Sequence, residues 1–255
     1  MTTRDTPQAG STLILGGAAS RTPAARLGVA VVHHLVSAIV NGEVPPGDTL
    51  PPEERLAQHF GVSRTVIRES VKRIEEKGLV AVAPGRGTTV QPSTSWNILD
   101  PVVLSVMLEN DDSLGVLDDL AVIRGALEGA MSGETAGRRT EDQLEELRTA
   151  LQRMETSVHD LDDFPNADAD FHFLVMTLSG NQLASSITRI LFQRARQTAR
   201  FSANQTPEAH ELTFSEHRRV YEAIAAGDAA AAEAAMKAHI IDSWQRRRLP
   251  TKRDS

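Results

Sequence analysis

Residues 48–90 decide the fold, and they read DTLPPEERLAQHFGVSRTVIRESVKRIEEKGLVAVAPGRGTTV. The amphipathic run LPPEERLAQHF predicts a short helix that ends at Gly61, because glycine accepts the left-handed backbone of a helix end without steric cost. Ser63 can then cap a second helix, expected over 64–77, by accepting a backbone N–H. The last part, 79–90, alternates weakly around a Pro-Gly turn and predicts two short strands. The stretch therefore predicts a helix-turn-helix followed by a wing.

The second of these helices has two faces of different chemistry. Its apolar positions recur at helical spacing and predict a buried face, made by Ile67, Val71 and Ile74. Three cations recur every four residues and form a stripe away from that face. The stripe alone would favour a solvated surface. The turn, the cap, the stripe and the wing together favour a helix that enters the major groove of DNA.

The DNA contacts expected from this pattern lie in the helix-turn-helix and at the tip of the wing. Arg86 stands between two glycines at the hairpin turn, where a cation can reach a phosphate or the minor groove. The candidate DNA-binding residues are Arg55, Ser63, Arg64, Thr65, Arg68, Lys72 and Arg86.

The formal net charge of -7 becomes compatible with DNA binding once it is divided along the 255 residues. Residues 26–90 hold eight Lys/Arg and seven Asp/Glu, whereas residues 91–255 hold 17 Lys/Arg and 26 Asp/Glu. The cationic surface is therefore local, and the acidic remainder suits a domain that does not touch phosphate. The chain has no cysteine, which excludes disulfides and thiolate metal sites. It has no apolar run long enough for a membrane span, and a cytoplasmic protein is expected.

The expected fold is mainly α, with a three-helix winged helix-turn-helix followed by an all-helical bundle. We expect a disordered tail at 1–25, the winged domain at 26–90, a linker at 91–99, the helical domain at 100–249 and a second tail at 250–255. The first helix, at about 26–42, is expected to bury Val29, Val32, Leu35, Val36 and Ile39.

Helical periodicity continues from Asp100 to the C-terminal region, and no strand pattern follows residue 90. The later helices are expected at about 100–110, 114–137, 141–159, 165–179, 181–204, 207–226 and 228–248. Trp96 in the linker is expected to pack where two domains meet. The basic run RRRLPTKRDS at 246–255 reads as a frayed end.

Four polar residues of the helical domain form a possible metal site: Asp168, His172, His217 and His239. The first two are four residues apart and share one helix face, while the two later histidines are flanked by apolar core positions. Three imidazoles and one carboxylate suit Zn, Ni, Mn or Fe(II) and disfavour Ca or Mg. Spacing alone leaves unrelated histidines as an open alternative. His59, His159 and His210 are expected on helix surfaces.

Residues 48–90 resemble the winged helix-turn-helix of the GntR family of bacterial transcription regulators. The later region resembles the FCD ligand-binding domain of the FadR-like branch, in VIRGALEGAM at 122–131, DADFHFLVMTLSGN at 168–181 and EHRRVYEAIAAGDAAAAEAAMKAHI at 216–240. The run WNILDPVVLSVMLEND at 96–111 resembles members that regulate galactonate and related sugar-acid catabolism. The resemblance implies that the four residues of the possible metal site are the family's metal ligands.

The resemblance also implies an effector site beside the metal. Arg124 matches a family arginine that pairs with an effector carboxylate, a pairing suited to the forked guanidinium group. A salt bridge to Glu128, four residues later, is the alternative for this arginine. Asn181 lies in a region that can line the pocket, and a helix cap is its alternative.

The resemblance implies DNA contacts from Arg64 and Arg68, with one departure nearby. The family usually has arginine directly after the first glutamate of its LPxER motif, whereas here Glu54 holds that place and arginine follows at Arg55. One residue turns a helical side chain by about 100°. The operator preference of better-known members is therefore not carried over.

These observations predict a homodimeric, metal-containing transcription regulator that is not an enzyme. We expect a repressor of a carbohydrate-acid operon that binds double-stranded operator DNA and is released by a small carboxylate such as a sugar acid. Zinc is the first candidate for the metal. One alternative is a metal-dependent hydrolase fused to a DNA-binding head, but the nearest carboxylates, Asp170 and Glu216, are expected to project away from the ligands. Another is a DNA-binding regulator whose metal is purely structural.

Overall fold

The computed structural model describes residues 23–112, 114–199, 201 and 206–248. The expected N-terminal tail falls outside these residues up to position 22, and the first helix already begins at Pro23. The expected tail at 250–255 also lies outside the described residues.

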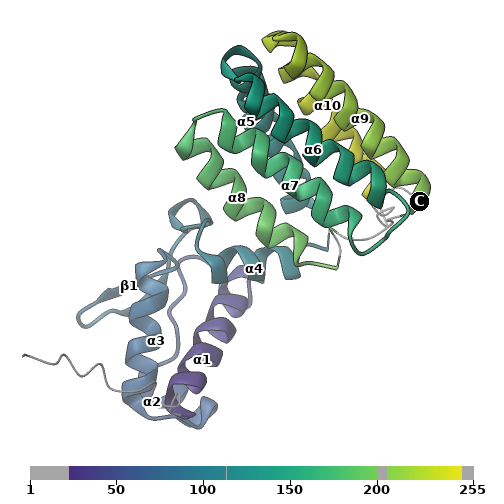
Figure 1. Cartoon of the computed structure of the whole chain (residues 1–255). Coiled ribbons are helices and arrows are strands. Elements are labelled where there is room, and N and C mark those ends of the chain that lie inside the picture. The colour runs from purple at the N-terminus through teal and green to yellow at the C-terminus, as the bar shows by residue number, and fades with distance from the viewer. Residues whose placement is uncertain (1–22, 113, 200, 202–205, 249–255) are drawn as a thin grey trace, which may run out of the picture.

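The N-terminal part is a winged helix-turn-helix (Figure 1). Its elements are α1 (Pro23–Val40), α2 (Glu53–Phe60), α3 (Arg64–Glu76), β1 (Val80–Ala83) and β2 (Gly87–Val90). The predicted turn is confirmed, because Gly61 has a φ of 63° and the Ser63 hydroxyl accepts a hydrogen bond from the backbone N–H of Val66. The strands pair antiparallel from Val80 opposite Val90 to Ala83 opposite Gly87.

The core of this part comes from one side of each helix and from the base of the wing. Its buried residues include Val32, Leu35, Val36, Ile39, Ile67, Val71 and Ile74, as predicted. The prediction for Val29 is wrong, since this side chain is 61% exposed. Val31 is buried instead, because the face of α1 that packs against the core carries Val31 and not Val29.

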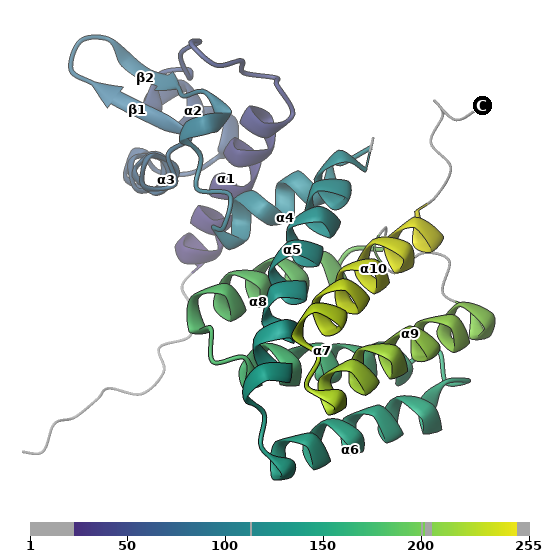
Figure 2. The same cartoon turned by 90° about the horizontal axis from the view of Figure 1, so that it is seen from above.

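The C-terminal part is an all-helical bundle, as expected (Figure 2). It follows the short 3-10 helix η1 (Ser93–Ser95) and comprises α4 (Pro101–Glu109), α5 (Gly115–Arg138), α6 (Glu141–Ser157), α7 (Phe164–Leu178), α8 (Gln182–Arg196), α9 (Pro207–Ala226) and α10 (Ala229–Arg247). Small residues let α5 and α10 approach closely. A Cβ atom at Gly133 would lie 3.0 Å from the carbonyl oxygen of Ala229, and one at Gly129 would lie 3.1 Å from that of Glu233.

Helix α8 is shorter than predicted, because it ends at Arg196 instead of continuing to residue 204. The hydroxyl of Thr198 bonds the carbonyl of Ala195 and closes the helix end. The chain then carries Phe201 inward, where its ring stacks on Trp244 with the centroids 6.1 Å apart.

The first three residues of the C-terminal basic run, 246–248, are not frayed as predicted. Arg246 donates two hydrogen bonds of 2.7 Å to Glu216, and Arg248 pairs with Asp118 at 3.2 Å. These pairs tie the end of α10 to α9 and α5, so residues 246–248 are part of the bundle.

Helix α4 belongs to two cores at once. Val103 and Val106 are buried with the residues of α1 and α3, whereas Leu104 and Leu108 are buried with those of α5 and α8. Trp96 packs against the first of these cores. Helix α4 is therefore shared between the two parts, and it lies between them in Figure 2.

Candidate metal centre and ligand cavities

The four predicted metal ligands meet inside the helical bundle. Asp168 and His172 come from α7, His217 from α9 and His239 from α10. One ligand atom of each residue lies within 4.8 Å of the corresponding atom of every other, and all four side chains are buried. The helices thus bring together residues up to 71 positions apart in the sequence.

Each of the three imidazoles directs its Nε2 edge toward the other two rings. The Nε2 atom of His172 lies 3.2 Å from Nε2 of His217 and 3.2 Å from Nε2 of His239. The Oδ1 atom of Asp168 lies 3.5 Å from Nε2 of His217. The four ligand atoms therefore surround a common point.

The opposite edge of each ring faces an oxygen that can accept a hydrogen bond. Nδ1 of His217 lies 2.9 Å from the carbonyl oxygen of Thr213, Nδ1 of His239 lies 2.9 Å from Glu216, and Nδ1 of His172 lies 2.6 Å from Glu128. Because such oxygens can only accept hydrogen bonds, the proton of the His217 and His239 rings lies on Nδ1, and the charge of Glu128 favours the same tautomer in His172. Every Nε2 is then left with a lone pair.

These facts fit a bound transition metal. Three lone pairs directed at one another repel unless a cation lies between them, and Oδ1 of Asp168 is buried with no hydrogen-bond partner among the described residues. Nitrogens bound to one zinc ion at roughly 2.0–2.1 Å in a tetrahedral arrangement lie roughly 3.3 Å apart, close to the separations in this cluster. Open coordination positions would remain for a ligand oxygen only if the metal takes more than four ligands.

The protonation states are those that metal binding requires. Burial lowers the pKa of His217 to about 4 and that of His239 well below its ordinary value, so both rings are neutral at pH 7. Burial alone would raise the pKa of Asp168, but the nearby charges of His172, His217 and Arg247 outweigh it and lower that pKa. A neutral imidazole and an ionised carboxylate are the forms that bind metals.

Two glutamates contact the Nδ1 atoms of candidate ligands, on the side of the ring opposite Nε2. The sequence does not predict this role. Glu128 lies between His172 and Arg124, while Glu216 lies between His239 and Arg246. The expectation that Glu216 projects away from the site is wrong, because it contacts a ligand that the next helix supplies. Asp170 does lie on the surface, where it pairs with Arg153. Partners of this kind fix the orientation of metal-binding imidazoles.

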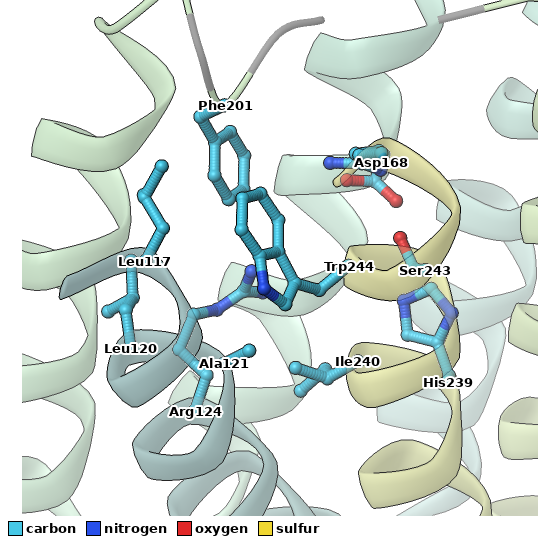
Figure 3. Close-up of a pocket in the computed structure, with 11 residues that line it drawn as sticks. Leu117, Leu120, Ala121, Arg124, Asp168, Phe201, His239, Ile240, Ser243 and Trp244 are labelled. Atoms are coloured by element: carbon cyan, nitrogen blue, oxygen red, sulfur yellow. The ribbon is translucent and has the colours of Figure 1, made fainter. Parts of the chain in front are cut away.

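Arg124 forms the salt bridge that was its alternative and also reaches a cavity beside the metal centre. Its Nε atom lies 2.6 Å from Glu128, and its guanidinium carbon lies 3.6 Å from the centre of the Phe192 ring. The cavity, of about 20 Å³, is lined by Arg124, Asp168, His239 and Arg247 among others (Figure 3). Figure 3 shows Arg124 rising from α5 toward Trp244, with Asp168 and His239 on the other side. We call this space the inner cavity.

A larger space adjoins the inner cavity and shares Asp168, Phe201 and Arg247 with it. It has a volume of about 380 Å³, within the usual range of small-molecule sites, and we call it the outer cavity. Arg247 lies at the junction and has no hydrogen bond or ion pair to the residues that the structure describes. The sequence does not predict this role for Arg247, because the residue belongs to the basic run at 246–255, for which a frayed end is expected.

The structure does not bring Asn181 to either cavity. Its side chain is exposed at the start of α8, where Oδ1 accepts a hydrogen bond from the backbone N–H of Ala184. Asn181 is therefore a helix cap, the alternative noted for it, and its predicted effector contact has no support in this geometry. His210 is also not where it was expected, since only 4% of it is exposed.

All the candidate DNA-binding residues lie on the surface of the winged helix-turn-helix. Arg68 is held by Glu53 of α2, with Nη2 3.2 Å from Oε2. Arg55 is exposed on α2, and Arg86 lies at the turn of the wing. The geometry leaves these cations available to a nucleic acid.

The comparisons with known proteins agree with these two parts. Residues 27–90 match the family described as "Bacterial regulatory proteins, gntR family", and residues 119–242 match the FCD domain. The chain is 32% identical to the HTH-type transcriptional regulator LutR of Bacillus subtilis over 80% of its length and 93% of that protein. It is also 32% identical to the galactonate operon transcriptional repressor of Escherichia coli, over 85% of this chain and 94% of that protein.

A solved structure shows a similar fold. Lar of Listeria monocytogenes superposes with a TM-score of 0.54 and 23% identity, covering 87% of this chain and 96% of that one. Within the described residues, no helix has both the length and the apolar content needed to cross a membrane. The relatives are regulators and not enzymes. The chain belongs to the GntR family of bacterial transcription regulators, with an FCD domain after its DNA-binding head.

Proposed function

We propose that this protein is a metal-containing repressor that leaves its operator when a small carboxylate binds beside the metal. The observation that carries this proposal is the junction of the metal centre with the two cavities. The candidate metal cluster, the guanidinium of Arg247 and that of Arg124 all border the inner cavity. Carboxylates bind both to divalent metals and to arginine, so an anionic ligand suits this place.

Asp168, His172, His217 and His239 would hold the metal, with zinc as the first candidate and Ni, Mn or Fe as others. When bound, the metal supplies a Lewis-acidic position for an oxygen atom of the ligand. The chain supplies the rest: Arg124 and Arg247 provide positive charge, and Phe192 and Phe201 exclude water from one side. A purely structural metal would not explain why Arg247, next to it, has no ion pair within the part of the chain that the structure describes.

The proposed ligand class is a sugar acid or a related carboxylate from carbohydrate catabolism. Support comes from the chain's similarity to a galactonate operon repressor and from the run at 96–111. In this proposal the protein acts in the cytoplasm, where the operator and the acid are both present.

Repression needs two heads on one operator, and we propose a homodimer. Two helices that pack against each other, α5 and α8, expose Val122, Ile123, Leu183 and Ile190. Apolar side chains on neighbouring helices suit a contact between two copies. Leu183→Glu should shift the protein from dimer to monomer in size-exclusion chromatography with light scattering. A dimer that persists in this variant would place the contact elsewhere.

The experiment that tests the whole proposal measures DNA binding in four conditions. Fluorescence anisotropy of the zinc-loaded and the chelated protein on operator DNA would be followed with and without galactonate and a panel of other carboxylates. We expect a carboxylate to weaken DNA binding only when the metal is present. The same response in the chelated protein, or no response to any acid, would contradict the proposal.

A further inference from the structure

His210 is a buried histidine that the metal centre does not use. It lies in the first turn of α9, with its ring stacked on Phe164 at a centroid distance of 4.3 Å. Its Nδ1 atom lies 3.2 Å from the carbonyl oxygen of Val158. Because that oxygen can only accept, Nδ1 carries the proton and Nε2 is left as an acceptor.

The Nε2 atom of His210 is buried and has no hydrogen-bond partner among the described residues. A buried acceptor without a partner is costly, and most such groups are paired in folded proteins. Burial also lowers the pKa of His210, which keeps the ring neutral and Nε2 unprotonated at pH 7. A ligand group that donates a hydrogen bond would therefore remove an existing cost.

His210 lines the outer cavity, together with Arg247 and Asp168. The inner cavity of about 20 Å³ has room for little more than one water-sized group, so the body of any ligand must occupy the outer cavity. A ligand held by its carboxylate near Arg247 would then extend along the wall that contains His210.

The charges of the cavity decide what kind of donor fits. Arg196 and Arg247 both line it, against the exposed carboxylate of Asp162 and the metal-binding Asp168. An ammonium group on the ligand would add positive charge beside the two arginines and is therefore disfavoured. A hydroxyl group donates a hydrogen bond without carrying charge. Phe164 and Phe192 supply apolar surface for the carbon chain of the ligand.

We propose that His210 determines specificity by accepting a hydrogen bond from a hydroxyl group of the effector, so that the protein selects hydroxycarboxylates over plain carboxylates. This inference rests on the proposed function, because it assumes that a carboxylate binds beside the metal. It assigns to the outer cavity the selection of the ligand, and to the inner cavity the binding of its carboxylate.

The test compares matched ligands on matched variants. Isothermal titration of the zinc-loaded, full-length protein would use galactonate and glycerate as hydroxy acids, with hexanoate and propionate as counterparts of equal carbon number without hydroxyl groups. His210→Asn keeps an N–H donor toward Val158 but has no group at the Nε2 position. His210→Gln restores an oxygen near that position. His159→Asn, at an exposed histidine, is the control.

We expect the wild type and the control to prefer a hydroxy acid over its counterpart. His210→Asn should reduce this preference by about tenfold, the usual effect of one hydrogen bond to a buried group, and His210→Gln should recover part of it. The affinity for the plain acids should change little. The melting temperature without ligand would show whether each variant folds.

The two proposals fail in different ways. If the zinc-loaded wild type binds none of the acids, the proposed function itself is wrong and this inference falls with it. If hydroxy and plain acids bind equally well, the carboxylate response stands and the role of His210 is wrong. An equal loss of affinity for both kinds of acid in His210→Asn would also overturn it, since the ring would then only shape the cavity.

Discussion

The DNA-binding surface and the metal centre are built in opposite ways. The candidate DNA-binding residues lie within 55–86 and are all exposed. The candidate metal ligands extend over 168–239, come from three helices and are all buried. The exposed site needs only a folded scaffold and solvent around its side chains. The buried site needs a second layer of partners, because every polar atom removed from water must be paired.

The second layer explains why the two sites should respond differently to mutation. Glu128 and Glu216 contact candidate ligands of the metal centre, whereas Glu53 forms an ion pair with Arg68, whose side chain is 70% exposed. A change in the buried layer alters metal binding and folding together. A change on the surface alters only what the surface touches.

The largest effect is expected from His172→Ala. Nε2 of His172 lies 3.2 Å from Nε2 of both other imidazoles, and the loss of His172 also leaves Glu128 without one of its two partners. Metal content measured by elemental analysis should fall from full occupancy to the background level, and the response to carboxylates should disappear. The DNA-binding head should remain folded, because its core is separate. Unchanged metal content would disprove the four-ligand site.

Glu128→Gln should sharpen the comparison by changing the second layer alone. The amide has nearly the same shape, but it removes the charge that lies between Arg124 and His172. Metal affinity should fall by about 10–100-fold in a competition with a chelator. Glu134→Gln, at an exposed position of the same helix, is the matched control. If both variants bind zinc equally, Glu128 has no role in holding the ligand.

Arg68→Ala tests the surface site. We expect operator affinity to fall by about tenfold, because an arginine contact to a base edge contributes roughly 1–3 kcal/mol. Arg148→Ala removes the same charge from the exposed side of α6, and it should leave the gel-shift affinity nearly unchanged. Equal behaviour of the two variants would mean that α3 is not the recognition helix. Metal content should stay constant in both.

The smallest effect, on folding stability, is expected at α4, the helix that joins the two regions. Asp100 caps α4 through bonds to the backbone N–H groups of Val102 and Val103, and its other oxygen lies 2.5 Å from Nζ of Lys77. Asp100→Ala should lower the free energy of unfolding by about 1 kcal/mol in urea titrations. Lys77→Met keeps the cap and removes the ion pair, so it should cost less. If Lys77→Met lowers the free energy of unfolding more than Asp100→Ala does, the ion pair and not the helix cap is the main contribution of Asp100.

Much of the DNA-binding head could be predicted because its signals are local. Gly61 and Ser63 define the turn through their own backbone preferences, and the apolar spacing of α3 identifies its buried face. Val29 was misplaced for a related reason. It fits the helical spacing, but α3 packs on the side of α1 that carries Gly28, Val31 and Val32, and Val29 points away from that side.

The metal centre could be predicted only in part. The spacing of Asp168 and His172 on one helix indicates a shared face, whereas their link to His217 and His239 depended on the resemblance to a family. The sequence predicts that Glu216 projects away from the site, because it is adjacent to His217 in the chain. In the structure it contacts His239, a candidate ligand on another helix. Adjacent residues of a helix point in different directions, and a neighbouring helix can use the second direction.

The sequence by itself determined the order of the helices, the turn and the cap of the DNA-binding head, and the residue types that can bind a metal. These properties depend on backbone preferences and periodicity, which act within a few residues. Only the tertiary structure decided that α4 belongs to two cores, that Arg247 borders both cavities, and that Nε2 of His210 is buried with no hydrogen-bond partner in the described part of the chain. The burial and pairing of a side chain depend on helices far away in the sequence, and the chain must fold before they meet.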